Sequence, residues 1–187
     1  MRLRNKIFRR VKATTKTHYF SSDDVKKIID SEIFLDRKTA FIIASDSGAR
    51  AGEMVKIEVD DIDYDKKQML LWDSKKTAYK VIPLSDNTLS AIQTYVRTCK
   101  IKRKLFDRHP TTLNNWIKDN CKKNGIAPDP DRKLRWHSWR GTFVRLNRDK
   151  GHKWLMQVTG DSYETLLGYY EELTDADLGK IKRGEAL

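Results

Sequence analysis

Hydrophobic residues recur at helical spacing over most of the chain. Residues 20–30 (FSSDDVKKIID) open with a serine cap at Ser21 or Ser22, and two aspartates in the first turn match the positive end of a helix dipole. Residues 36–48 (DRKTAFIIASDSG) predict a buried helix that ends at its last glycine, and residues 49–57 (ARAGEMVKI) predict a further short helix.

Near residue 57 the pattern changes to short runs typical of strands. Charged turns separate three such runs, which are residues 57–65 (IEVDDIDYD), 67–73 (KQMLLWD) and 79–85 (YKVIPLS). Connections this short join antiparallel neighbours, so the runs predict a small three-stranded antiparallel sheet.

Helical patterns return after this sheet. Residues 85–99 (SDNTLSAIQTYVRTC) start with Ser-Asp, and residues 111–125 (TTLNNWIKDNCKKNG) start at a threonine cap and end at a glycine. Residues 126–133 (IAPDPDRK) predict a loop because of their prolines, and three or four more helices follow from residue 136. The fold class is therefore α+β, a mainly helical domain with one small inserted sheet.

The charge of the chain points to a polyanionic partner. Its 187 residues leave room for one domain with a substantial core or for two small domains, and 38 Lys and Arg against 26 Asp and Glu give a formal charge of +12. A merely soluble basic protein is the alternative. Residues 1–18 carry seven Lys or Arg and no acid, so they form either a basic arm or linker on DNA or a solvated tail.

Composition excludes several other classes of protein. Two cysteines, Cys99 and Cys121, are too few for a disulfide framework or a Cys-rich zinc site, and a reducing intracellular compartment fits them. No apolar run approaches the length of a membrane span, and no His/Asp/Glu set has the spacing of metal ligands. A glycine loop for a nucleotide is also missing, so we expect no cofactor, no metal and no membrane association.

Four short motifs carry residues that can act on a phosphate. Arg50 and Glu53 lie one helical turn apart and can pair, although surface ion pairs of this kind are common. Lys75 and Lys76 occupy the tip of the predicted hairpin, where lysine is also an ordinary turn residue. Taken alone, each of these two motifs is better explained as structure.

The other two motifs lie toward the C-terminus. His137 and Arg140 are three residues apart on a predicted helix, so an imidazole and a guanidinium share one face and can meet one phosphate. Trp136 and Trp139 beside them are interpreted as packing that keeps the helix rigid. The last motif offers three candidate nucleophiles, which are Tyr163, Tyr169 and Tyr170, although taken alone these tyrosines are better explained as packing residues of a helix.

The order of these motifs resembles the tyrosine recombinase (phage integrase) family over about residues 20–175. SGARAGEM is similar to that family's first-arginine box, HSWRGTF to its His-x-x-Arg box, and VTGDSYETLLGYY to its Gly-His turn followed by the nucleophilic tyrosine. Two positions depart from the family pattern. Asp161 stands where the family usually has His or Trp, and Gly141 stands where it usually has a second His.

The resemblance implies the tyrosine-recombinase catalytic fold and a site-specific recombinase or integrase. Such an enzyme cleaves and rejoins double-stranded DNA through a covalent 3′-phosphotyrosine, without a metal. Arg50, held by Glu53, and Arg140 would clamp the phosphate, because their planar forks suit its oxygens. His137 would donate to the phosphate and exchange a proton with the tyrosine.

Two site positions each have two candidates. Counting nine residues from Asp161 selects Tyr170 as the nucleophile, which we take, whereas aligning the YET segment selects Tyr169. The interval to the Pro-Leu pair that closes the hairpin selects Lys75 as the acid that protonates the leaving 5′ oxygen, whereas the Lys-Thr spelling selects Lys76.

The resemblance also divides the chain. Residues 1–18 would be the interdomain linker and residues 19–187 the catalytic domain, without the family's N-terminal core-binding domain. It further implies self-association on DNA, a mobile genetic element as the source, and a location in the host cytoplasm or nucleoid. An ionised Asp161 cannot donate a hydrogen bond to a phosphate, so a catalytically weakened DNA-binding module is the alternative. A type IB topoisomerase-like enzyme is a second alternative.

Overall fold

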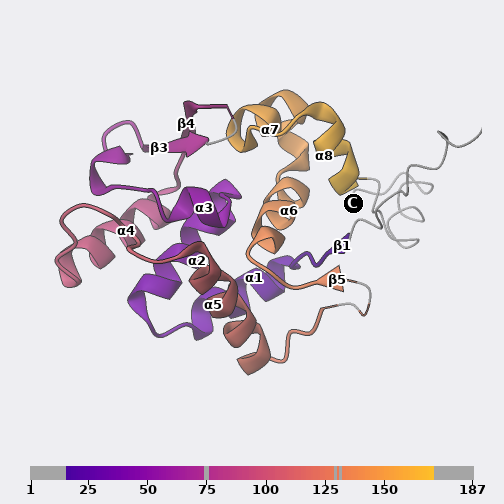
Figure 1. Cartoon of the computed structure of the whole chain (residues 1–187), viewed down its shortest axis with the longest axis horizontal. Helices are drawn as coiled ribbons and strands as arrows, with labels where there is room; N and C mark the ends of the chain where they lie inside the picture. The colour runs from indigo at the N-terminus through magenta and orange to yellow at the C-terminus, as the bar shows by residue number, and fades with distance from the viewer. Residues whose placement is uncertain (1–15, 74–75, 129, 131, 171–187) are drawn as a thin grey trace, which may run out of the picture.

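Helix α2 (Leu35–Ser47) runs through the centre of the molecule and packs against α4 and α6 (Figure 1). The computed structural model describes residues 16–73, 76–128, 130 and 132–170. The other α-helices are α1 (Ser22–Ser31), α3 (Ala51–Met54), α4 (Asp86–Thr98), α5 (Pro110–Lys123), α6 (His137–Leu146), α7 (His152–Thr159) and α8 (Tyr163–Tyr170). Two short 3-10 helices are η1 (Val59–Asp61) and η2 (Arg148–Lys150).

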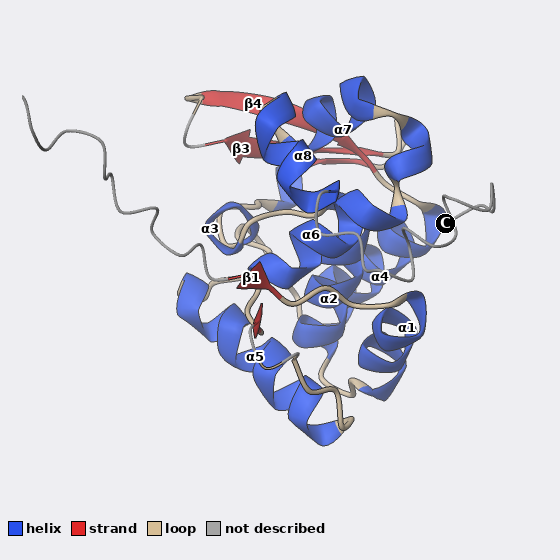
Figure 2. Ribbon diagram, turned by 90° about the vertical axis from the view of Figure 1, so that its right-hand side faces the viewer, coloured by secondary structure: helices blue, strands red, loops and turns tan. Residues whose placement is uncertain are grey.

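The predicted sheet is confirmed as an antiparallel meander in the order β2-β3-β4. Its strands are β2 (Ile62–Asp63), β3 (Gln68–Asp73) and β4 (Ala78–Pro83). Alternate residues of β3 and β4, such as Met69, Leu71 and Ile82, are buried, as strand geometry requires of a sheet with one face on the core. Figure 2 shows the sheet with α7 and α8 at one end of the molecule and α1 and α5 at the other.

A second, parallel pairing joins β1 (Lys16–Thr17) to β5 (Arg132–Lys133), in the register Lys16↔Arg132. The sequence did not predict it, and the expectation of an unpaired loop through residue 133 is wrong at its end. Two-residue strands show no hydrophobic period, so only the tertiary contact reveals them. The expected basic arm over residues 1–18 lies outside the described residues except for its last three.

Local capping signals account for most helix ends. Ser21 caps α1, with its hydroxyl accepting from the backbone of Asp24, and α2 ends at Gly48 with a φ of 59°. The threonine cap expected for α5 is wrong. Pro110 occupies the first turn of that helix and His109 caps it, because a proline fits the first turn, where no N–H is needed.

Helix α6 is anchored by aromatic packing. Trp136 and Trp139 are fully buried and pack against Phe41 of α2, with ring centroids 6.1 and 5.8 Å away, so their predicted packing role is confirmed. Within the part of the chain that the structure describes, each helix is too short or too polar to cross a bilayer.

Candidate active site

Arg50 lies between the left-handed turn at Gly48 and the first residue of α3. The Glu53 carboxylate accepts from the Arg50 backbone N–H at 2.8 Å and from its Nη1 at 2.8 Å, so the side chain and the helix start are fixed together. Trp136, the residue just before α6, adds a third restraint, because its Nε1 donates to the Ala49 carbonyl at 2.9 Å. The Arg50–Glu53 pair inferred from sequence is therefore formed.

Arg140 lies in α6 and is fully buried. Its Nη1 donates to the Gly48 carbonyl at 3.1 Å, and its Nη2 donates to the Thr159 carbonyl. Its Nε donates to Asp161 Oδ2 at 2.7 Å, and its Nη2 forms an ion pair with the same oxygen at 2.7 Å. Through these contacts Arg140 connects three segments that are distant in sequence, which are α6, the end of α2 and the end of α7.

Asp161 bridges the two arginines. One carboxylate oxygen accepts from Arg50 Nη2 at 2.6 Å, and the other accepts from Arg140. Its backbone follows Gly160, whose φ of 73° ends α7 in the left-handed region. Asp161 therefore accepts hydrogen bonds from both arginines, in the place where the family pattern has a donor.

Lys80 of β4 is a member of this site that sequence reasoning missed. Its Nζ donates to both oxygens of Glu53, at 3.1 and 3.2 Å, and to the Thr159 carbonyl at 3.1 Å. Burial lowers the pKa of Lys80, and the Glu53 carboxylate opposes this. The available signal was a lysine at an inward position of an alternating strand. We call Arg50, Glu53, Lys80, Arg140 and Asp161 the arginine cluster.

The net electrostatic effect on Arg50 favours its charged form. Burial lowers the pKa of Arg50, but the carboxylates of Glu53 and Asp161 outweigh burial and raise that pKa above its ordinary value. A charged Arg50 therefore stays in place beside the equally charged Arg140, because Asp161 bridges the two guanidiniums and Glu53 also pairs with Arg50.

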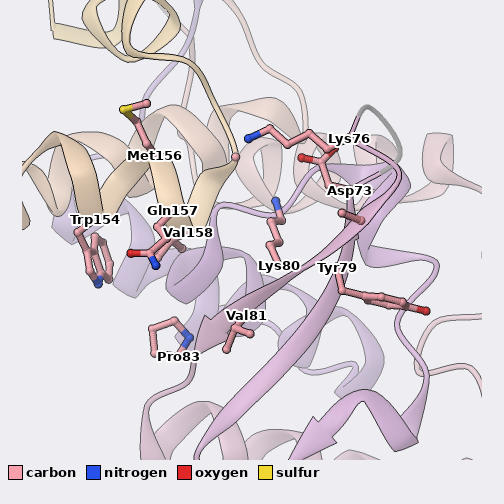
Figure 3. A pocket seen from close by; sticks show the side chains of 12 residues that line it. Asp73, Lys76, Tyr79, Lys80, Val81, Pro83, Trp154, Met156, Gln157 and Val158 are labelled. Carbon is pink, nitrogen blue, oxygen red and sulfur yellow. The ribbon is translucent and has the colours of Figure 1, made fainter.

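A cavity of about 540 Å³ opens beside the cluster, between β4 and α7 (Figure 3). Figure 3 shows the Lys76 and Lys80 side chains reaching toward the same end of this cavity, with the Asp73 carboxylate beside Lys76. A Cβ at Gly160 would lie 2.7 Å from the Asp73 carboxylate and 3.9 Å from Lys76 Nζ. Only glycine leaves room for the buried Asp73 at this turn.

Tyr169 and His137 form a second group, which we call the tyrosine pair. The Tyr169 hydroxyl lies 3.1 Å from His137 Nε2, and the Tyr169 side chain is 8% exposed. Burial, together with the charges of Arg140 and Arg135, lowers the pKa of His137 to about 4, so its imidazole is neutral near pH 7. Burial and the Asp161 carboxylate raise the pKa of Tyr169, while Arg140 and Arg50 oppose them.

Of the residues singled out from sequence, Arg50, Glu53, His137, Arg140, Asp161 and Tyr169 come together in one site. Lys76 lies at its edge, beside Gly160. Lys75 and the side chain of Tyr170 lie outside the described part of the structure. Tyr163 is 46% exposed and contacts His152 instead, with ring centroids 5.0 Å apart.

The chemistry of this arrangement follows from its donors. Two guanidiniums converge on one carboxylate, which shows that their forks can hold a small anion between them. A neutral imidazole touches a phenol at the edge of the same cluster, so it can take the phenol's proton. Among the described residues, no three His, Cys, Asp or Glu side chains are grouped as metal ligands.

Comparisons with known proteins place the chain in a family. The profile of the Phage integrase family matches residues 18–160. The chain is 28% identical over 127 residues to tyrosine recombinase XerA of Saccharolobus solfataricus, covering 68% of this chain and 42% of that protein. It is 28% identical over 141 residues to XerA of Pyrococcus horikoshii, covering 70% of this chain and 47% of that protein. The chain thus spans less than half the length of these two relatives.

Solved structures show the same fold. A crystal structure of XerA recombinase matches with a TM-score of 0.76 at 20% identity, over 90% of this chain and 65% of that one. A lambda integrase dimer bound to a COC′ core site matches with a TM-score of 0.68 at 16% identity, over 84% of this chain and 49% of that one. The described part has the fold of a tyrosine recombinase catalytic domain, and the chain belongs to the phage integrase family.

Proposed function

We propose that this chain is the catalytic part of a site-specific recombinase that cleaves and rejoins double-stranded DNA through a 3′-phosphotyrosine on Tyr169. The observation that carries the proposal is the Tyr169 hydroxyl, 3.1 Å from the neutral His137 and beside the two arginines that hold the Asp161 carboxylate. This choice differs from the count along the sequence, which favours Tyr170. Tyr169 is preferred because its hydroxyl lies in the site.

In the proposed step, the Tyr169 oxygen attacks phosphorus and the bond from phosphorus to the 5′ oxygen breaks. His137 Nε2 takes the phenol proton, and a hairpin lysine gives a proton to the leaving 5′ oxygen. Arg50 and Arg140 hold the two free phosphate oxygens, on which negative charge grows. Reversal of the same step on a new 5′ hydroxyl rejoins the strand, so no external energy source is required.

The state of His137 suits this role once DNA is bound. Without DNA, its pKa of about 4 leaves it unprotonated, so it can accept but is a weak base. A phosphate beside it adds negative charge, which raises its pKa toward the useful range. The same phosphate meets Arg50 and Arg140, whose charges favour the phenolate of Tyr169.

Asp161 has a supporting role in this proposal. It holds the two guanidiniums toward each other while no phosphate is present, and it balances their charge in a buried place. Arg50 keeps further N–H groups beyond those that contact Glu53 and Asp161, because a guanidinium has five donors. A phosphate can therefore be held without removing every protein contact.

The proton donor to the 5′ oxygen is proposed to be Lys75, with Lys76 as the alternative. Lys80 is an unsuitable donor because its Nζ is committed to Glu53 and the Thr159 carbonyl. DNA with sulfur in place of the bridging 5′ oxygen separates the candidates, since a thiolate leaves without a proton. The responsible Lys→Ala variant should recover cleavage on that DNA, whereas the other variant should be active on both substrates.

Adduct formation tests the proposed function. Short duplexes with a nick and a randomised core are incubated with the protein, and covalent complexes are isolated under denaturing conditions. We expect an adduct whose DNA-linked peptide carries the nucleotide on Tyr169. Sequencing the DNA in these complexes identifies a selected duplex. Tyr169→Phe should bind this duplex normally and form no adduct, while the matched control Tyr170→Phe should keep adduct formation.

Other outcomes would replace the proposal. An adduct on Tyr170 would show that the count of nine residues from Asp161 identifies the nucleophile correctly. Retention of DNA by the wild-type chain without any adduct would favour the DNA-binding module, to which the Asp161 bridge between the arginines lends weight. Relaxation of supercoiled DNA without strand exchange would favour the topoisomerase-like enzyme.

Partners and domain roles extend the same proposal. We propose double-stranded DNA as the partner, with residues 1–18 as a basic arm along it and residues 19–187 as the catalytic domain. Self-association on DNA is proposed because strand exchange needs more than one active site.

A further inference from the structure

Gly141, next to Arg140 in the middle of α6, makes room for an aromatic ring. A Cβ at this position would lie 2.0 Å from Cε1 and 2.4 Å from Cδ1 of Tyr19. Gly141 has no positive φ, so backbone conformation does not require glycine here. Glycine weakens a helix interior, so the close approach of Tyr19 is the physical reason for the residue.

The segment that carries Tyr19 is fixed on both sides. Thr17 pairs with β5 and accepts from Arg135 Nη2 at 2.9 Å through its hydroxyl. Phe20 is buried, its N–H donates to the Thr142 hydroxyl at 2.8 Å, and its ring lies 5.1 Å from that of Trp139. Tyr19 therefore reaches α6 at a set position, 122 residues before Gly141 along the chain.

Tyr19 also contacts the tyrosine pair. Its ring meets the Tyr169 ring edge-on, with centroids 6.3 Å apart. The guanidiniums of Arg132 and Arg145 lie 5.2 and 4.9 Å from the centroid of the Tyr19 ring. Arg145 is one helical turn beyond Gly141, so α6 supplies both the space for the ring and one of its cations.

From these contacts we propose that Tyr19 is a positioning residue that presses on the Tyr169 ring and keeps its hydroxyl on His137. The proposal rests on the proposed function, because Tyr169 is the nucleophile in both. Tyr19 reaches no reacting atom and acts only through Tyr169. The segment where the chain enters this domain thereby helps to set the geometry of the attacking oxygen.

Four variants test this proposal, and the nicked duplex selected with the wild-type protein serves as the probe. Tyr19→Ala should slow adduct formation by about tenfold to a hundredfold at saturating protein, the scale expected when a reacting group is misplaced by about 1 Å. Duplex affinity and the melting temperature measure whether binding and folding are kept. Tyr19→Phe is the matched control, and it should restore the rate because the ring remains.

Gly141→Ala probes the same contact from the other side. Its new methyl group must push the Tyr19 ring away, so adduct formation should slow to a similar extent. The double variant Tyr19→Ala with Gly141→Ala has space for the methyl group, so it should be no slower than Tyr19→Ala alone. Such non-additivity identifies one shared contact.

The outcomes separate this proposal from the proposed function. If the wild-type chain forms an adduct on Tyr169 and Tyr19→Ala forms it at the same rate, only the positioning role is overturned. The positioning role would also be overturned if the rate losses of the two single variants multiplied in the double variant. The same holds if Tyr19→Ala lost adduct-formation rate and duplex affinity to the same extent. If the wild-type chain forms no adduct on Tyr169, the proposed function fails and the positioning role falls with it.

Discussion

The arginine cluster and the tyrosine pair are neighbours built in different ways. In the cluster, two carboxylates join Arg50, Arg140 and Lys80 through contacts of 2.6–3.2 Å. Its members come from the start of α3, from β4, from α6 and from the turn after α7. In the tyrosine pair, the hydroxyl of Tyr169 contacts His137 and shares a side-chain hydrogen bond with Arg140, and the Tyr169 ring packs edge-on against Tyr19.

This difference matches what each group would do in the proposed reaction. Charge that stabilises a transition state works best when it is fixed beforehand, since no reorganisation is then needed. A nucleophile must approach phosphorus as its bond forms. The Tyr169 hydroxyl is held by hydrogen bonds and a ring contact rather than by ion pairs, so it can make that movement. The comparison predicts that damage to the cluster and damage to the pair differ in kind.

The largest expected effect comes from replacing the guanidinium of Arg140 in the arginine cluster. Arg140→Lys keeps the charge but loses the planar fork that would hold the phosphate oxygens, so cleavage should fall by at least about a hundredfold, on the scale of one lost oxyanion donor. Duplex affinity should stay near that of the wild type. Single-turnover cleavage and duplex retention measure the two, with Arg148→Lys in η2 as the matched control. Equal losses in both would make Arg140 a binding residue.

The next effect concerns the tyrosine pair and pH. The pKa of His137 is about 4 in the folded chain and about 6.5 when unfolded, so the unfolded state binds more protons between these values. The free energy of unfolding should therefore rise with pH from 4 to 6.5, by up to about 3 kcal/mol from this residue. His137→Asn should flatten that rise in denaturant titrations. If the free energy of unfolding of His137→Asn rose with pH as steeply as that of the wild type, His137 would not be the cause of the rise.

A smaller effect sharpens the role of Asp161. Asp161→Asn keeps an accepting oxygen but leaves the buried Arg140 without an ionised partner, which should cost about 1–3 kcal/mol of stability. A bound phosphate supplies the missing charge, so duplex DNA should raise the melting temperature of the variant more than that of the wild type. The exposed Asp149→Asn is the matched control. An equal DNA-induced rise in both proteins would place the phosphate away from this carboxylate.

The smallest expected effect is that of a chelator. Arg50 and Arg140 supply the positive charge that a metal ion gives in other phosphoryl-transfer sites, so excess chelator should leave adduct formation unchanged within error. A loss of activity that magnesium restores would contradict the proposed mechanism.

Much of the fold follows from short-range patterns in the sequence. Ser21 and Gly48 mark helix ends because cap chemistry and left-handed turns act over a few residues. The three strands are visible because alternation is a local property of one strand. Arg50 with Glu53, and His137 with Arg140, are readable for the same reason, since each pair lies within one helical turn.

The remaining features depend on contacts that no local pattern records. Asp161 meets Arg50 across 111 residues, and Tyr19 meets Gly141 across 122, so spacing gives no sign of either contact. In the sequence Lys80 has the pattern of an ordinary strand residue, and only the folded structure places the Glu53 carboxylate and the Thr159 carbonyl around its ammonium group.

The choice between Tyr169 and Tyr170 was harder still to predict. Adjacent helical residues point about 100° apart, and the turn at Gly160 sets the rotation of α8 about its axis, which decides which of the two faces the site. The sequence by itself determined which residue types were available and which helices and strands would carry them. Only the tertiary structure decided which side chains share one buried space, because packing between distant segments fixes the rotation and depth of each element.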